Sequence, residues 1–223
     1  MKISASEVNR LRKSTGSGMM DCKKALEESG GDYEKAIEIL RKKGQKVAAN
    51  RADRESSEGV VLAKVNSDKT AGIIISLNCE TDFVARNQDY LKLANDLANH
   101  ALSFDTLENF LSSSFENMSV SEKLLEQTGV IGEKIEIGTF KKLTAPYVGH
   151  YIHNGNKIAS IIGLSGIIKG AEEISKNVCM QVAAMNPIAL DENTVPTEIV
   201  QKEIEIAKDQ LRKEGKPEEM LEK

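Results

Sequence analysis

The chain has 223 residues, of which 40% are hydrophobic and 29% charged, the composition of a globular protein long enough to bury a core. Its 30 basic residues against 34 acidic ones give a net charge of −4, which argues against a protein that holds nucleic acid on a basic surface. No apolar run approaches the ~18 residues of a membrane span, and the start has no signal-peptide pattern. The 3 cysteines lie too far apart for a disulfide framework. We therefore expect a reducing, cytoplasmic setting.

The first 45 residues are predicted to form a compact module of three short helices. Ser4–Glu7 matches a capping box, Thr15–Gly18 breaks the first helix, and a second helix follows over 19–29. The third helix carries apolar residues at i, i+3, i+4 and i+7, and Gly44 is placed to end it. These apolar residues are Tyr33, Ala36, Ile37 and Leu40. A core this small is typical of a binding module rather than an enzyme.

Residues 46–58 have no sustained apolar stripe, and we interpret them as a linker with some helical content. The first half of a core is predicted over 59–132. It starts with a hairpin of two β-branched runs, Gly59–Val65 and Ile73–Leu77. A helix follows, with its inward positions at Tyr90, Ala94, Leu97, Ala98 and Ala101. The polar remainder is predicted to be helical in pieces, one of them started by the capping box Ser119–Glu122.

A similar order of elements predicts a second half of the core over 133–187. Its strands are Ile135–Phe140, Val148–His153 and Ile158–Ile162. Asn154 and Gly155 between the last two strands are a strong hairpin signal, and Ile167 with Ile168 is expected to extend the sheet. The closing helix has its apolar positions at Ile174, Val178, Val182 and Met185.

Residues 188–223 are predicted to form an incomplete coiled-coil hairpin. Val200, Ile204, Ala207 and Leu211 are spaced as in a coiled-coil seam. Pro217 and the acidic residues after it are expected to start the return helix, of which the chain contains about two turns. The predicted fold class is therefore α+β: a three-helix module, two related halves with antiparallel sheets and helices, and part of a coiled coil.

Motifs of covalent chemistry are not found in this sequence. There is no nucleophile elbow, no zinc-protease motif and no phosphate-binding loop. His150 and His153 lie three apart in or near a strand, so their rings are expected on opposite faces, and a metal site with no third ligand is not expected. The three cysteines are interpreted as small buried hydrophobic residues, and no cofactor is expected.

Two local features favour partner binding, and the residues alone leave their roles open. Met19 and Met20 are adjacent at a helix start, so at least one is expected to be exposed, although both could lie partly in the small core. The segment 78–84 joins a strand to a helix, and Thr81 or Asp82 is a natural N-cap. Phe83 then either packs on the core or protrudes as a wedge.

These same segments resemble bacterial elongation factor Ts. The N-terminal module is similar over residues 11–44, and a second hallmark of the family lies at 78–87, NCETDFVARN. A third lies at 151–164, YIHNGNKIASIIGL, and the tail resembles the coiled-coil insertion. The match runs in order along almost the whole chain. It departs from the family at Asn156, where a glycine is common, and in ending inside the coiled coil.

The resemblance implies a guanine-nucleotide exchange factor for elongation factor Tu that makes no covalent bond, with a module like the ubiquitin-associated fold. It implies that an exchange tip disturbs the magnesium and phosphate site of Tu, and that this tip is Thr81, Asp82, Phe83 and Val84. The implied contacts of the module with the nucleotide-binding domain of Tu are Leu11, Arg12, Met19 and Met20. Those with the third domain of Tu are His153, Asn154 and Gly155.

Three alternatives stay open at this point. The chain could be a binding adaptor without exchange activity, a truncated factor that binds Tu but exchanges poorly, or a small enzyme with an unrecognised site. A homodimer is also compatible with the resemblance, because family members that lack part of the core pair to complete it. No contact with nucleic acid or a membrane is expected.

Overall fold

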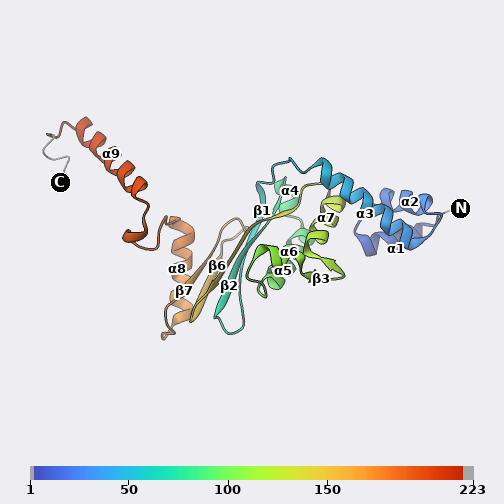
Figure 1. Ribbon diagram of the computed structural model, residues 1–223, viewed down its shortest axis with the longest axis horizontal. Coiled ribbons are helices and arrows are strands. Elements are labelled where there is room, and N and C mark those ends of the chain that lie inside the picture. Colours follow the sequence, from blue (N-terminus) through green and yellow to red (C-terminus); the bar gives the residue numbers. More distant parts are fainter. Residues whose placement is uncertain (1–2, 218–223) are drawn as a thin grey trace. The chain divides into compact units, whose positions relative to one another are not determined.

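The computed structural model describes residues 3–217, and the chain separates into two compact units, Met1–Ala183 and Ala184–Lys223. In the first unit, three helices are followed by an antiparallel sheet with its covering helices, a second hairpin and a further helix (Figure 1). The expected α+β fold class is confirmed. Among the described helices, none combines the length and the apolar character needed to cross a membrane.

The N-terminal module consists of α1 (Ala5–Thr15), α2 (Met19–Glu28) and α3 (Tyr33–Asn50). The predicted capping box is present, because Ser4 and Glu7 satisfy each other's backbone N–H groups at the start of α1. Asp32 caps α3, because its side chain accepts the N–H of Lys35. The buried side chains of the module form their own small core, made of Val8, Leu11, Cys22, Ala25, Leu26, Ala36 and Leu40.

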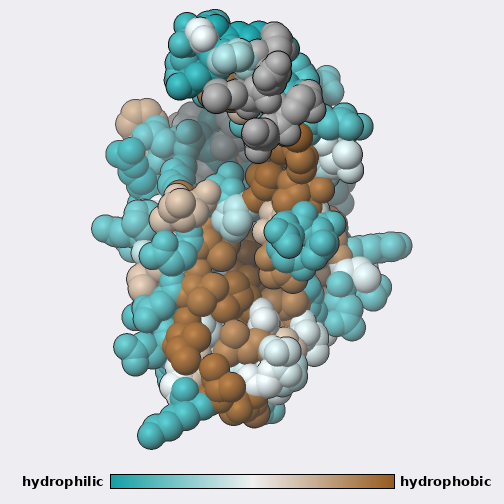
Figure 2. Space-filling view, turned by 90° about the vertical axis from the view of Figure 1, so that its left-hand side faces the viewer, coloured by the Kyte–Doolittle hydropathy of each residue, from teal (hydrophilic) through white to brown (hydrophobic). Residues whose placement is uncertain are grey.

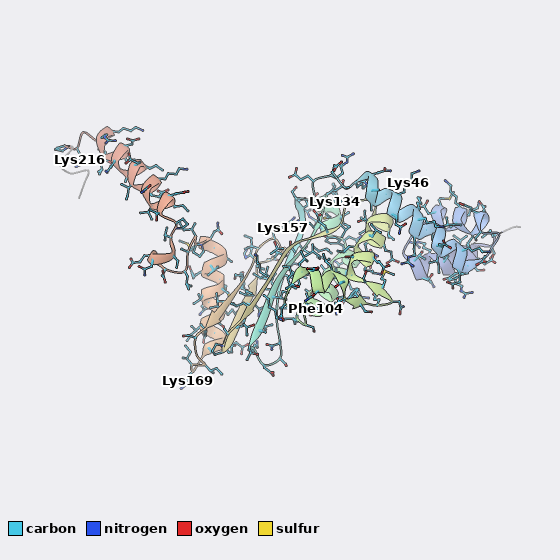
Figure 3. The ribbon with its side chains drawn as sticks, viewed as in Figure 1. Lys46, Phe104, Lys134, Lys157, Lys169 and Lys216 are labelled. Carbon is cyan, nitrogen blue, oxygen red and sulfur yellow. The ribbon has the colours of Figure 1, made fainter. Side chains whose placement is uncertain are left out.

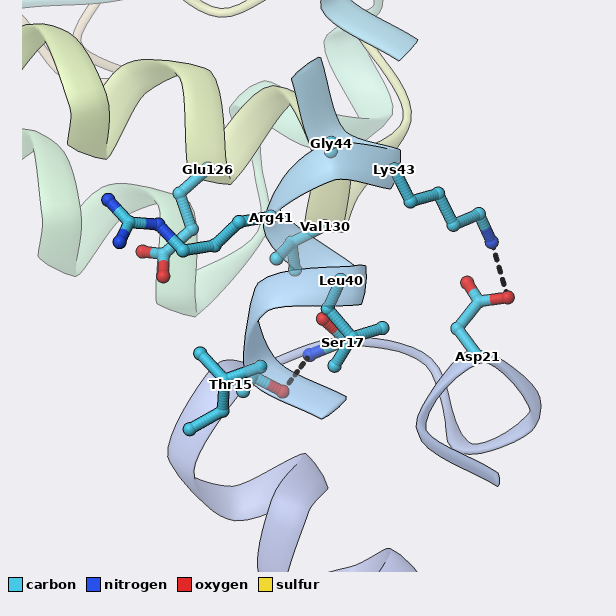
Figure 4. Close-up of a pocket in the computed structure, with 11 residues that line it drawn as sticks. Thr15, Ser17, Asp21, Leu40, Arg41, Lys43, Gly44, Glu126 and Val130 are labelled. Carbon is cyan, nitrogen blue, oxygen red and sulfur yellow. Dashed lines mark hydrogen bonds and ion pairs between the residues drawn. The ribbon is translucent and has the colours of Figure 1, made fainter. Parts of the chain in front are cut away.

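The prediction that Gly44 ends the third helix is wrong, since α3 continues to Asn50. Gly44 is buried where α3 crosses α7 (Val120–Ile131), and Gly129 faces it there. A Cβ built on Gly129 would lie 2.4 Å from the Cα of Gly44, so the two helix backbones touch. Figure 4 shows Gly44 at this crossing, with Glu126 and Val130 of α7 beside it. The glycine therefore serves close helix packing, and the predicted linker begins as the last turn of α3.

The central sheet has the antiparallel order β1-β2-β5, made of β1 (Glu58–Val65), β2 (Ala71–Cys79) and β5 (Glu136–Thr144). Alternate residues of β2 are buried, and the long helix α5 (Gln88–Ala101) packs on β1 and β2. The hydroxyl of Tyr90 in α5 donates to the Leu77 carbonyl at 2.6 Å. The same core contains residues of α6 (Leu107–Ser112) and α7, and between these helices lies a small hairpin of β3 (Ser114–Phe115) and β4 (Met118–Ser119).

The second hairpin consists of β6 (Tyr147–Ile152) and β7 (Ala159–Leu164), followed by α8 (Ala171–Met185). Its turn is attached to the central sheet, because the Val61 N–H donates to the Asn156 carbonyl at 2.8 Å and Lys157 pairs with Glu58. Figure 3 labels Lys157. The expected β extension at Ile167 and Ile168 is wrong. Both are exposed and belong to no strand, since a bend at 165–166 precedes them and a turn at 169–170 leads into α8.

The strand β5, which the sequence assigns to the second half of the core, pairs with β2 of the first half. The main sheet therefore crosses the expected boundary between residues 132 and 133. The division into two related halves, and the other domain bounds, stay predictions.

Exposed apolar side chains gather on α8 and on the segment before it. Ile174 and Val178, one helical turn apart, are 41% and 42% exposed, and Ile167 is 77% exposed. Figure 2 shows a broad apolar area on the face of the molecule that it views.

The second unit contains the 3-10 turn η1 (Glu192–Thr194) and the helix α9 (Thr197–Lys213). Val200 and Ile204 of the predicted coiled-coil seam are exposed on α9. The predicted return helix, with Glu218 and Glu219, lies outside the described residues.

Candidate functional site

The tip, defined as Thr81–Val84, projects where the central sheet passes into its first covering helix. Thr81 rather than Asp82 is the N-cap of the short helix α4 (Asp82–Ala85), and its side chain accepts from the Val84 N–H. Ala85 is buried in the core, while Phe83 is 83% exposed. Residues two apart on a helix point about 200° apart, so burying Ala85 turns Phe83 outward. Phe83 thus protrudes instead of packing on the core.

Asp82 and Val84 complete the tip on either side of Phe83. The Asp82 carboxylate pairs with the Arg86 guanidinium at 2.9 Å, one helical turn further on. Both groups are accessible, with side-chain exposures of 41% and 81%. Val84 packs partly against the main core. The tip therefore presents one aromatic ring beside an accessible carboxylate.

The base of the tip is joined to the turn between α7 and β5 by reciprocal hydrogen bonds. One oxygen of the Glu133 carboxylate accepts the N–H groups of Glu80 and Thr81 at 3.1 and 3.0 Å, and the other accepts the Thr81 hydroxyl at 2.6 Å. In return, the Glu80 carboxylate accepts the Lys134 N–H at 2.7 Å. The Arg51 guanidinium, just beyond the end of α3, donates to Glu80 at 2.8 Å. The base of the tip is thus held by two other parts of the chain, the turn between α7 and β5 and the end of α3.

Acid is expected to weaken this attachment at Glu80. The Lys134 N–H and the Arg51 guanidinium lower the pKa of the Glu80 carboxyl below its ordinary value. A group with a lowered folded pKa contributes stability above its unfolded pKa of ~4.3 and loses it as the pH falls through the folded pKa. Urea unfolding between about pH 6 and about pH 3 should therefore show a steeper loss in the wild type than in Glu80→Gln. Parallel pH profiles of the two proteins would contradict this expectation.

On the module, Arg12, Met19 and Met20 are accessible and Leu11 is not. Met19 is 55% and Met20 62% exposed, so both methionines of the pair face outward. The Arg12 side chain is also exposed. Leu11 is fully buried in the core of the module, so the direct partner contact expected of it does not fit this structure. Its side chain packs between the helices and holds α1 in place.

The hairpin turn, defined as His153–Lys157, is a second exposed polar projection. His153, Asn154 and Gly155 are all exposed. The His153 N–H donates to the Ile158 carbonyl at 2.8 Å, and the Asn156 N–H donates to the His153 carbonyl at 3.0 Å. Gly155 and Asn156 both have positive φ, at 87° and 55°. Asparagine tolerates that conformation, which explains how the turn keeps its shape without a glycine at 156.

The register of the sheet brings the hairpin turn and the tip to one end of the β1-β2 ladder. Glu58, which pairs with Lys157 of the hairpin turn, lies opposite Cys79 in that register. The tip begins two residues after Cys79. Thr81, Phe83 and Val84 also line a groove together with residues 13–16 at the end of α1.

Sequence reasoning did not single out Arg51, Glu80 and Glu133 as residues of this site. Their contacts join residues 29 to 54 positions apart. Glu80 lies within the motif at 78–87, but no motif indicates Arg51 or Glu133. Within residues 3–217 no group of His, Cys, Asp and Glu side chains is arranged to hold a metal ion. His150 and His153 have no further ligand beside them, and Cys22, Cys79 and Cys179 are buried as predicted.

The sequence of the chain is similar to known proteins of one family. A sequence model described as elongation factor TS matches residues 80–223. The protein named elongation factor Ts of Christiangramia forsetii is 64% identical over 222 residues, which are 100% of this chain and 81% of that protein. The elongation factor Ts of Flavobacterium psychrophilum is 60% identical over 99% of this chain and 80% of its own length. That of Chlorobaculum tepidum is 46% identical, over 100% of this chain and 80% of its own length. The matched residues include the tip and the hairpin turn.

Proposed function

Because this chain belongs to the elongation factor Ts family, it is a nucleotide exchange factor for elongation factor Tu in translation elongation, and we propose that the tip is the part that drives GDP out. The observation that carries this proposal is the 83% exposure of Phe83 on a helix whose opposite side is packed in the core. A large aromatic side chain held this far into solvent adds little to folding and is suited to enter a partner.

Exchange requires that the factor bind nucleotide-free Tu more tightly than GDP-bound Tu. By linkage, the affinity of Tu for GDP then falls by the same factor. Each ~1.4 kcal/mol of preference for the nucleotide-free form corresponds to about a tenfold loss of GDP affinity. No bond of the factor is made or broken in this process. We therefore assign the chain no covalent chemistry, no metal and no cofactor of its own.

Within the tip, Phe83 acts as an apolar wedge and Asp82 as a negative charge. The ring would displace side chains of Tu that order its magnesium ion. The Asp82 carboxylate would approach the magnesium and phosphate site and weaken it electrostatically. Thr81 caps the helix that carries both groups, and Val84 anchors it on the core.

Two further surfaces dock the factor on Tu. Arg12, Met19 and Met20 contact the nucleotide-binding domain, and flexible methionine side chains suit such a surface. The hairpin turn, with His153, Asn154 and Gly155, contacts the third domain of Tu. Its attachment to β1 through Asn156 gives it a defined place beside the tip.

Neutralising Asp82 is expected to slow exchange moderately. Asp82→Asn keeps the size of the side chain and removes its charge, so GDP release at saturating factor should slow about threefold to tenfold. Stopped-flow measurement with fluorescent GDP reads this directly. Asp68→Asn, in the exposed turn at the other end of the β1-β2 hairpin, is the matched control and should release GDP as the wild type does. An Asp82→Asn rate equal to that of the control would remove Asp82 from the mechanism.

The same assay separates the proposal from its alternatives. A stable complex with Tu but no faster GDP release would identify a binding adaptor, or a chain that binds without efficient exchange. Faster release that the tip variants leave unchanged would place exchange elsewhere on the surface. We also propose that the chain is located in the cytoplasm. We further propose that it forms a homodimer that covers the apolar face of α8, which sedimentation would detect.

A further inference from the structure

We infer that Glu133 is a positioning residue for exchange, whose carboxylate sets the direction in which the tip enters Tu. Glu133 lies outside the tip and directly follows Gly132, which caps the C-terminus of α7. This inference rests on the proposed function, because a residue that positions the tip matters for exchange only if the tip acts.

The hydrogen-bond geometry of Glu133 determines the start of α4. A single carboxylate oxygen accepts two successive backbone N–H groups, those of Glu80 and Thr81. Two bonds from consecutive peptide units to one atom restrict the rotation of the chain between them. The direction of the first helical residue is thereby set before α4 begins.

The second oxygen of Glu133 determines the orientation of the cap itself. It accepts the proton of the Thr81 hydroxyl at 2.6 Å, a short bond as expected for a charged acceptor. With its proton committed to Glu133, the hydroxyl oxygen offers its lone pairs to the Val84 N–H, which lies 3.5 Å away. The cap bond is long, and α4 has only four residues, too few to form a stable helix unaided.

Glu133 can act in this way because its own backbone is held in place. The helix α7 that precedes it crosses α3 in backbone contact at Gly129 and Gly44. The next residue, Lys134, donates its N–H to Glu80, which also binds Arg51 at the end of α3. The tip is therefore supported by a turn fixed between packed helices. Since a 1 Å error in placing an acting group can cost about a hundredfold in rate, loss of this support should affect the exchange step.

The experiment measures GDP release from Tu over a range of factor concentrations, giving a maximal rate and a half-saturating concentration. Glu133→Ala should lower the maximal rate about tenfold and leave the half-saturating concentration within about twofold, because the module and the hairpin turn still dock. Glu133→Gln retains one oxygen for the two N–H groups and should recover to within about threefold of the wild type. The matched control is Glu122→Ala, which removes similar bonds from Ser119 at the other end of α7 and should leave both values unchanged.

A second pair of variants keeps the test independent of whether Glu133→Ala folds. Thr81→Val removes the hydroxyl that Glu133 orients and should also lower the maximal rate, and Thr81→Ser should restore it. If Phe83→Ala slows release but the Glu133 and Thr81 variants, shown folded by circular dichroism, keep the wild-type maximal rate, the positioning role is wrong and the proposed function stands. If Phe83→Ala itself releases GDP at the wild-type rate, the proposed function fails and the positioning role fails with it.

Discussion

Replacing Phe83 with alanine is expected to lower the maximal rate of GDP release from elongation factor Tu about thirtyfold, which corresponds to ~2 kcal/mol. The side chain is 83% exposed in the free protein, so its ring is available to enter the partner without first leaving the core. For the same reason the free energy of unfolding should change by no more than about 0.5 kcal/mol. Stopped-flow release of fluorescent GDP and urea unfolding of the same preparations provide the two measurements.

Ile167→Ala is the matched control for this variant. Ile167 is also a large apolar residue in the first unit and is 77% exposed, but it lies in the segment before α8 and outside the proposed contacts with Tu. Its replacement should leave GDP release unchanged. Equal rates for Phe83→Ala and Ile167→Ala would contradict the wedge role of Phe83. Equal slowing by both would indicate a general effect of removing exposed apolar surface.

The two glycines at the crossing of α3 and α7 are expected to respond to alanine with opposite signs. A Cβ on Gly129 would lie 2.4 Å from the Cα of Gly44, where only backbone atoms could give way. Separating the helices should cost about 1–3 kcal/mol, which outweighs the gain of at most ~1 kcal/mol in helix propensity. A Cβ on Gly44 would lie 3.5 Å from the Cα of Gly129, an ordinary van der Waals distance. Gly44→Ala should therefore be neutral or stabilising by up to about 1 kcal/mol.

Urea unfolding followed by circular dichroism tests this pair, and each variant is the control for the other. Both changes add one methyl group to a helix, which makes the two variants comparable. The urea midpoint should fall for Gly129→Ala and stay or rise for Gly44→Ala. Destabilisation by both variants to a similar extent would show that the crossing cannot accommodate a methyl group on either side. Stabilisation by both would show that the helices can separate without cost.

Local features of the chain were predictable because their causes lie within a few residues. The capping boxes at Ser4 and Ser119 depend on a partner three positions away, and both are present. The turn at Asn154 and Gly155 depends on backbone preferences of neighbouring residues, and it joins two antiparallel strands. The class of the fold and the family resemblance follow from patterns of this kind, repeated in order along the chain.

The sequence by itself thus determined the α+β class, most elements and the family, and through the resemblance it indicated the residues now proposed for the tip, whereas the tertiary structure decided what those residues face. Phe83 could have packed inward or outward, and the burial of Ala85 beside it turns it outward. Gly44 has the local character of a helix end, but contact with Gly129, far away in the chain, places it inside α3. Glu133 has no local signal at all, since its partners Glu80 and Thr81 lie 53 and 52 positions away. Such contacts form only when distant segments pack together, and the energy of packing, not local preference, selects among the alternatives that each segment allows.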